Sequence, residues 1–222
     1  MKNKGSIHPS APEIIKSGIF DNIDSFQQLK RRISAIKDKD ENLQSKKRGD
    51  VFEIFCEAYL TLNKGFQTKN VFPQKATPIH ILSKLELPSV DKGYDGVYET
   101  IDGRFAIYQS KFRTENINLK WQGRNGLSST VGMGQKADII HLITTVTKVD
   151  KTFTSRSKVM QTLGNDLEPI DIDIFSKIEK WLKQTHITEE YIHTPEKYQE
   201  EALKNIKEEL DKKDRATIVM AC

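Results

Sequence analysis

Apolar residues recur along the chain at spacings typical of helices in some segments and of buried strands in others. A repeat of every three or four residues predicts an amphipathic helix over 24–36, and a broader apolar stripe predicts a second helix over 49–62. The continuous apolar run at 138–146 is typical of a buried strand. The nearly all-polar residues 37–47 are expected to form a solvated linker, and residues 1–18, with two glycines and two prolines, are expected to be irregular.

Shorter patterns predict the remaining elements. They indicate a strand or extended loop at 66–72, a short helix at 79–85, a helix at 127–137, a strand or turn at 170–175 leading into a helix at 176–183, a helix at 194–210 and an apolar strand at 215–222. Residues 147–166 are polar and fit neither template. We expect an N-terminal segment at 1–45, a main domain at 46–186 and the start of a further domain at 187–222.

Residues 91–113 are typical of a hairpin of two short strands joined at an Asp-Gly turn. Asp95 opens the first strand, and Gln109 and Lys111 end the second, on one face because they are two residues apart. A two-residue turn would place Asp95 opposite Ser110 and away from that face. A three-residue loop at 101–103, with its glycine in the left-handed conformation, would instead place Asp95 opposite Gln109. We predict the three-residue loop.

Asp95, Gln109 and Lys111 together suggest a metal-dependent phosphodiesterase. A carboxylate and an amide oxygen suit a hard ion such as Mg²⁺, and a lysine can orient a water or stabilise charge on a scissile phosphate. A second acid is expected, for which Glu53 or Glu57 is the best candidate and Asp91 a weaker one.

Composition permits a nucleic-acid partner. The net charge is +4, and basic residues gather in short clusters. The two cysteines argue against a disulfide framework, and the absence of a long apolar run argues against a membrane span, so a cytoplasmic setting is expected. The five histidines show no ligand spacing and are expected to be structural or solvent-facing. The residues expected to contact double-stranded DNA are Lys46, Lys47, Arg48, Arg113, Lys120, Trp121 and Arg124, although Trp121 could equally cap the core.

Three short motifs resemble the Mrr-like branch of the PD-(D/E)xK nuclease superfamily, in which Gln replaces the acid of the (D/E)xK element. They are Gly-Asp-Val-Phe-Glu at 49–53, Gly-Tyr-Asp-Gly-Val at 93–97 and Ala-Ile-Tyr-Gln-Ser-Lys at 106–111. The resemblance implies an α/β fold with a restriction-endonuclease-like core, a mixed β-sheet flanked by helices. It also implies a site of Glu53, Asp95, Gln109 and Lys111, in which the first three hold Mg²⁺ or, as a substitute, Mn²⁺.

The C-terminal residues resemble the Q-motif and the strand before the Walker A loop of superfamily 2 helicases, at 198–202 and 216–222. The resemblance implies that Gln199 contacts adenine, and that ATP serves only a downstream motor because no Gly-x-Gly-Lys-Thr loop is present. A nuclease ahead of such a motor resembles type I and single-chain type I-like restriction enzymes, whose methyltransferase and specificity parts would be further partners.

Three functions follow from these observations. The first is a DNA endonuclease domain of a restriction translocase, with little sequence specificity of its own. The second is a catalytically silent DNA-binding module that assists an ATP-driven translocase, and the third is an RNA-directed nuclease of the same fold.

Overall fold

A five-stranded mixed sheet forms the centre of the fold, in the order β1-β2-β3-β4-β5. The computed structural model describes residues 5–89, 93–123 and 127–184, all within one unit, Met1–Ile187. The strands are β1 (Thr68–Pro73), β2 (Gly96–Thr100), β3 (Phe105–Lys111), β4 (Ile139–Thr144) and β5 (Val159–Thr162). Strand β2 runs antiparallel to both β1 and β3, whereas β4 runs parallel to both β3 and β5.

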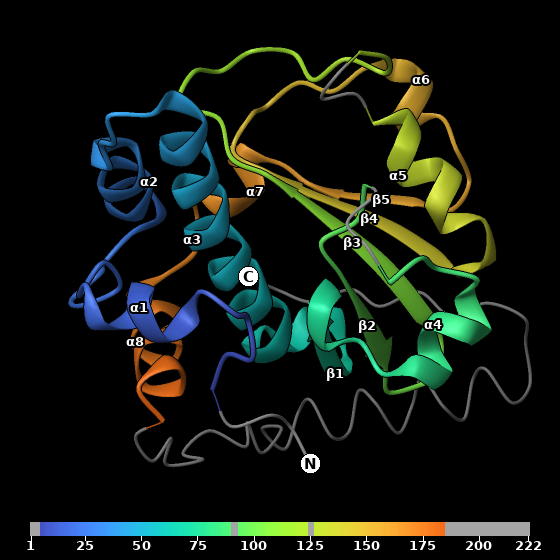
Figure 1. The fold of residues 1–222 in the computed structure, drawn as a ribbon, viewed down its shortest axis with the longest axis horizontal. Helices are drawn as coiled ribbons and strands as arrows, with labels where there is room; N and C mark the ends of the chain where they lie inside the picture. The colour runs from blue at the N-terminus through green and yellow to red at the C-terminus, as the bar shows by residue number, and fades with distance from the viewer. Residues whose placement is uncertain (1–4, 90–92, 124–126, 185–222) are drawn as a thin grey trace, which may run out of the picture. The chain divides into compact units, whose positions relative to one another are not determined.

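Helices cover both faces of this sheet (Figure 1). The larger group gathers around α3 (Glu41–Leu62), with α1 (Ala11–Lys16), α2 (Phe26–Ala35) and α8 (Ile172–Leu182) beside it. The opposite face carries α4 (Ile79–Leu85) and α5 (Ser128–Met133). Short elements complete the described chain: α6 (Lys151–Thr154), α7 (Gly164–Leu167), η1 (Lys64–Phe66), η2 (Gln74–Ala76) and η3 (Gly134–Lys136). This is the mixed α/β fold expected, and it is consistent with a restriction-endonuclease-like core.

Alternation along the strands divides the apolar side chains between two cores. Tyr98, Ala106 and Tyr108 belong to the core with α3, while Val97 and Ile107 belong to the core with α4 and α5. Neighbouring residues of one strand therefore serve different layers.

Within the described residues, no helix is long and apolar enough to cross a membrane.

The expected linker at 37–47 is wrong from residue 41 onward, because α3 begins at Glu41. The side chain of Asp40 accepts hydrogen bonds from the backbone N–H groups of Asn42 and Leu43, which caps the helix. These first two turns are polar because they are mostly solvent-exposed, so their sequence carries no apolar stripe.

Two further expectations need correction. Residues 1–18 contain helix α1, with Pro12 in its first turn, where a missing N–H costs nothing. Residues 170–175 include no strand, since α8 begins at Ile172 with Asp171 as its cap. The helix at 79–85 is confirmed, as are the helix at 24–36 and the buried strand within 138–146. Ser25 caps the helix within 24–36. The predicted elements at 194–210 and 215–222 lie outside the described residues.

We expect Gly96→Ala to destabilise the fold by about 1–3 kcal/mol, because the added methyl overpacks the sheet. A Cβ at Gly96 would meet the Phe72 carbonyl oxygen and would lie 2.5 Å from the Tyr108 ring. Urea unfolding followed by circular dichroism would measure the loss.

Gly132→Ala on α5 is the matched control. A Cβ at Gly132 meets no atom within 4 Å, so this change should be neutral or slightly stabilising. Equal effects of the two substitutions would contradict the close approach at Gly96.

Candidate active site

The loop of the β2–β3 hairpin fixes which residues meet across it. Gly96 pairs with Tyr108 and Val97 with Ile107, while the Thr100 N–H donates to the Arg104 carbonyl at 2.9 Å. The loop therefore holds three residues, 101–103, and Gly103 has a φ of +83° in the left-handed region. The predicted three-residue loop is confirmed.

This register brings Asp95, which lies just before β2, against the end of β3. Its backbone N–H donates to the Tyr108 carbonyl at 2.8 Å. Its Oδ1 accepts a hydrogen bond from Gln109 Nε2 at 2.9 Å, and its Oδ2 accepts from the Ser110 N–H at 2.6 Å and from Ser110 Oγ at 2.7 Å. The contact between Asp95 and Gln109 follows from the predicted register, whereas the role of Ser110 was missed.

Gln109 is held at both ends of its amide. Its side chain is buried, and its Oε1 accepts a hydrogen bond from Thr130 Oγ1 on α5 at 3.0 Å. Its nitrogen, rather than its oxygen, therefore faces Asp95. Thr130 was not predicted as a site residue, and no local signal in the sequence links it to Gln109.

Charges from two further predicted residues act on Asp95. Asp95 keeps some exposed surface, but its carboxylate is surrounded by protein. Desolvation by burial, followed by the nearby negative charge of Glu53, raises the pKa of Asp95 to about 7. The hydrogen bonds from Ser110 and the positive charge of the half-buried Lys111 act in the opposite direction. Glu53, Asp95, Gln109 and Lys111 thus share one neighbourhood.

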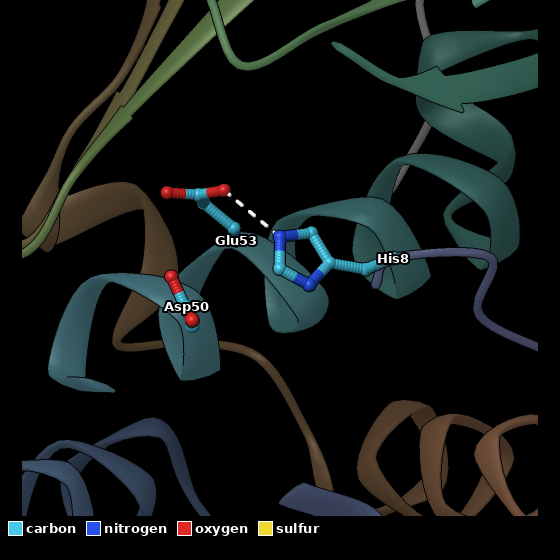
Figure 2. Close-up of side chains that lie close together, drawn as sticks. All are labelled: His8, Asp50 and Glu53. Carbon is cyan, nitrogen blue, oxygen red and sulfur yellow. Dashed lines mark hydrogen bonds and ion pairs between the residues drawn. The ribbon is translucent and has the colours of Figure 1, made fainter. Parts of the chain in front are cut away.

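An N-terminal segment of residues 6–10 lies against the acidic side of α3. His8 Nε2 lies 3.1 Å from Glu53 Oε2 (Figure 2). The Ser10 hydroxyl donates to Asp50 at 2.7 Å. His8, Asp50 and Glu53 each offer a ligand atom within 4.8 Å of the others, so the cluster could hold a metal ion. Sequence reasoning missed His8, because it lies 45 residues before Glu53 and shows no ligand spacing.

Glu57, the weaker alternative to Glu53, is occupied elsewhere. Its side chain is buried and accepts hydrogen bonds from the Ser6 hydroxyl and, at 3.0 Å, from the Ile7 N–H. Burial raises the pKa of Glu57, while these hydrogen bonds oppose that rise. Of the two glutamates, Glu53 is the one near Asp95 that keeps exposed surface.

The three basic residues expected to contact DNA at the start of the domain have partners within the protein. Lys46 pairs with Asp50 at 2.8 Å, and Lys47 pairs with Asp38 at 2.7 Å. Arg48 donates to the carbonyls of Ser34 and Ile36, near the end of α2. These contacts give each residue a structural role beside any contact with DNA.

The second group of expected DNA contacts lies after β3. The indole of Trp121 is half-buried against the core, and the Arg156 guanidinium lies 4.5 Å from its ring centroid. Lys120 is exposed, whereas Arg113 is half-buried and burial lowers its pKa. The arrangement of Trp121 favours its alternative role as a capping aromatic.

Three residues of the predicted sites lie outside the described residues: Arg124, Asp91 and Gln199.

Comparisons with known proteins assign no family to the chain. No model of a known protein family matches the sequence, and no curated protein matches it. The geometry of the residues therefore has to support any assignment of function.

We expect Asp95→Asn to become more stable relative to wild type as the pH rises from 5 to 8, in the presence of EDTA. The folded-state pKa of about 7 lies above the ordinary value of 3.8. Between these values the folded protein keeps a proton that the unfolded chain has released, so wild type loses stability as the pH rises through this window. Asparagine does not titrate. From pH 5 to pH 8, the free energy of unfolding of the variant relative to wild type should therefore rise on the order of 1–2 kcal/mol, as measured by urea unfolding. An offset between the two proteins that is the same at both pH values would contradict a raised pKa.

Proposed function

We propose that the chain is a metal-dependent DNA endonuclease domain, with its site at Glu53, Asp95, Gln109 and Lys111. The single observation that carries this proposal is the three-residue hairpin loop. The loop places Asp95 opposite Gln109, which lies two residues before Lys111 on β3. The negative charge of Glu53 also acts on Asp95. A structural carboxylate would have no need of a second acid close enough to raise its pKa.

The donor set supports a hard divalent cation, Mg²⁺ or, as a substitute, Mn²⁺. The negative charge of Glu53 raises the pKa of Asp95, and a cation held by both carboxylates would offset that repulsion. For Gln109 to bind through its oxygen, its amide must turn over. The hydroxyl of Thr130 can accept from the turned amide, so the Gln109 nitrogen would keep a partner after the turn.

Each residue then has a defined task in phosphodiester hydrolysis. The bound ion would lower the pKa of a water and neutralise charge on the phosphoryl group. Glu53 and Asp95 would hold the ion. In its present orientation Gln109 would fix the position of Asp95, and with its amide turned it would instead add an oxygen ligand. Lys111 would orient the attacking water or stabilise the negative charge that develops as the phosphorus–oxygen bond breaks.

A basic cavity beside the site supports a polyanionic substrate. Its volume is about 550 Å³. Its lining includes three cations, Lys30, Arg31 and Lys37, and one acid, Glu168. Among the described residues none of the three cations has a carboxylate partner, unlike Lys46 and Lys47. Thr114, which also lines the cavity, follows Lys111 by three residues. Phosphates flanking the scissile one would contact these cations.

We propose further that this domain works ahead of an ATP-driven helicase motor in a restriction system. Support comes from the resemblance of 198–202 and 216–222 to the Q-motif and the strand before the Walker A loop. The motor, its ATP and any methyltransferase or specificity parts remain proposals. A Gly-x-Gly-Lys-Thr motif directly after Cys222 in the natural protein would support the fusion, and its absence would count against it.

We expect the chain to nick supercoiled plasmid DNA in Mg²⁺ or Mn²⁺ and not in EDTA. Asp95→Ala and Lys111→Ala should each lower the nicking rate at least about a hundredfold, because each removes charge at the reacting phosphate. Both variants should keep the circular dichroism spectrum of wild type. Lys151→Ala, an exposed lysine on α6, is the matched control and should cleave like wild type.

Other outcomes of this assay point to the rival functions. Full activity in either the Asp95 or the Lys111 variant would refute the site. Salt-dependent DNA binding without cleavage and without Mn²⁺ binding would favour the silent DNA-binding module. Cleavage confined to RNA would favour the RNA-directed nuclease.

We expect the basic cavity to contribute to DNA affinity independently of cleavage. In an Asp95→Asn background, Lys30→Ala/Arg31→Ala should weaken binding to a fluorescein-labelled duplex. It should also reduce the slope of log K against log salt by about 2, because each phosphate contact contributes about 0.9. Fluorescence anisotropy at several salt concentrations measures both quantities.

Lys16→Ala/Lys177→Ala removes the same charge from α1 and α8 and serves as the control. Its affinity and its salt slope should remain closer to those of the parent. Equal losses in the two double variants would indicate a general effect of net charge and would contradict a phosphate track at the cavity.

A further inference from the structure

Three acids on one side of α3 are each contacted by a different part of the N-terminal segment of residues 6–10. Ser6 contacts Glu57, His8 contacts Glu53 and Ser10 contacts Asp50. The contacting residues are two apart along the segment, and the acids lie about one helical turn apart. The segment therefore runs antiparallel to the helix and matches its acids one by one.

These contacts leave the three acids in different states. Asp50 Oδ2 accepts both Ser10 Oγ and the charged Lys46 Nζ, so its charge is already balanced. Glu57 is buried and fully engaged by the segment. Glu53 accepts only the His8 contact among the interactions of the described residues, at Oε2, and its Oε1 takes part in none. Glu53 is thus the acid with an oxygen available for a ligand.

The hydrogen bonds of His8 decide which of its ring nitrogens carries the proton. The backbone N–H of Ser10 donates to His8 Nδ1 at 3.2 Å, so Nδ1 is the acceptor. In the neutral imidazole the proton then resides on Nε2, which lies 3.1 Å from Glu53 Oε2 and donates to it (Figure 2). A neutral donor can orient the carboxylate without cancelling its charge.

The same geometry disfavours His8 as a metal ligand in this arrangement. An ion bound at Nε2 would need that nitrogen unprotonated, which moves the proton to Nδ1. The Ser10 N–H would then face a second donor, and the segment would have to shift. The ligand atoms of His8, Asp50 and Glu53 lie close together, but this closeness does not distinguish a His8 that binds a metal ion from a His8 that donates to Glu53.

We infer that His8 is a positioning residue for Glu53: it donates Nε2–H to one carboxylate oxygen and leaves the other to hold the divalent cation. The inference rests on the proposed function, since it assigns Glu53 to the metal. It makes the N-terminal segment part of the active site. Partners that fix a ligating carboxylate contribute tenfold or more to metal affinity.

The test measures Mn²⁺ affinity by electron paramagnetic resonance on the full chain, with wild type, His8→Ala and His8→Gln. His8→Ala should weaken Mn²⁺ binding about tenfold, because Glu53 loses its donor. His8→Gln should bind within about threefold of wild type, because the glutamine amide can supply an N–H at the same reach. His80→Ala, which removes an exposed histidine on α4, is the control and should bind as wild type does.

A second readout does not depend on metal. Long-range ¹H–¹⁵N spectra of the histidine rings in EDTA should show His8 as the Nε2–H tautomer, and this signal should disappear in both His8 variants. A His8 ring with its proton on Nδ1 would overturn the inference. So would equal Mn²⁺ affinity in wild type and His8→Ala, or equal losses in His8→Ala and His8→Gln, which would indicate direct ligation.

Failure of the inference and failure of the proposed function give different results. If Asp95→Asn and Glu53→Gln both bind Mn²⁺ as wild type does, the metal site itself is wrong. If they lose Mn²⁺ while His8→Ala keeps it, only the role of His8 is wrong. Thermal unfolding of each variant in EDTA identifies any loss that comes from misfolding.

Discussion

The hydrogen bond between Asp95 and Gln109 depends on one extra residue in a hairpin loop. With three residues at 101–103, Asp95 faces Gln109, and the side chains of Gln109 and Lys111 lie on one face of β3. Removing one loop residue would pair Asp95 with Ser110 instead of Gln109 across the hairpin, and would place Gln109 and Lys111 on the opposite face from Asp95. Gly103 makes this loop accessible at little cost, because its φ of +83° is open to glycine and strained for other residues.

Helix α3 supplies both the packing that holds the sheet and the acid that faces Asp95. Phe52 and Phe55 are fully buried, and the Phe52 ring packs against Phe112 just after Lys111. Glu53 lies between these two apolar residues in sequence and points to another side of the helix, where some solvent remains. The position of Glu53 relative to the end of β3 is therefore fixed by core packing rather than by polar contacts alone. A flexible support would not keep two like charges near each other.

The parts of the site that follow local rules were predictable, and the parts that need long-range contacts were not. The register followed from loop length and the period of a strand, whereas the stripe of α3 left Glu53 and Glu57 open and the motif resemblance favoured Glu53. Thr130 and His8 were missed for a common reason. The Thr130 hydroxyl meets Gln109 only because α5 packs over β3, and His8 meets Glu53 only because the N-terminal segment returns to α3. No periodicity in a single sequence encodes such contacts. The first turns of α3 were missed because exposed turns carry no apolar signal, although Asp40 offered a cap.

The charge of Glu53 acts on Asp95, and the protein must oppose this repulsion when no cation is bound. Here the opposition comes from neutral donors as much as from charges: Ser110 donates twice to Asp95, Gln109 donates once, and His8 donates to Glu53. Neutral donors stabilise a carboxylate while leaving its charge in place, whereas a salt bridge such as Lys46 to Asp50 cancels it. Lys111 opposes only part of the rise caused by burial and Glu53, because the pKa of Asp95 still stands near 7. A divalent cation bound beside Asp95 would favour its ionised form and so offset the rest of this rise.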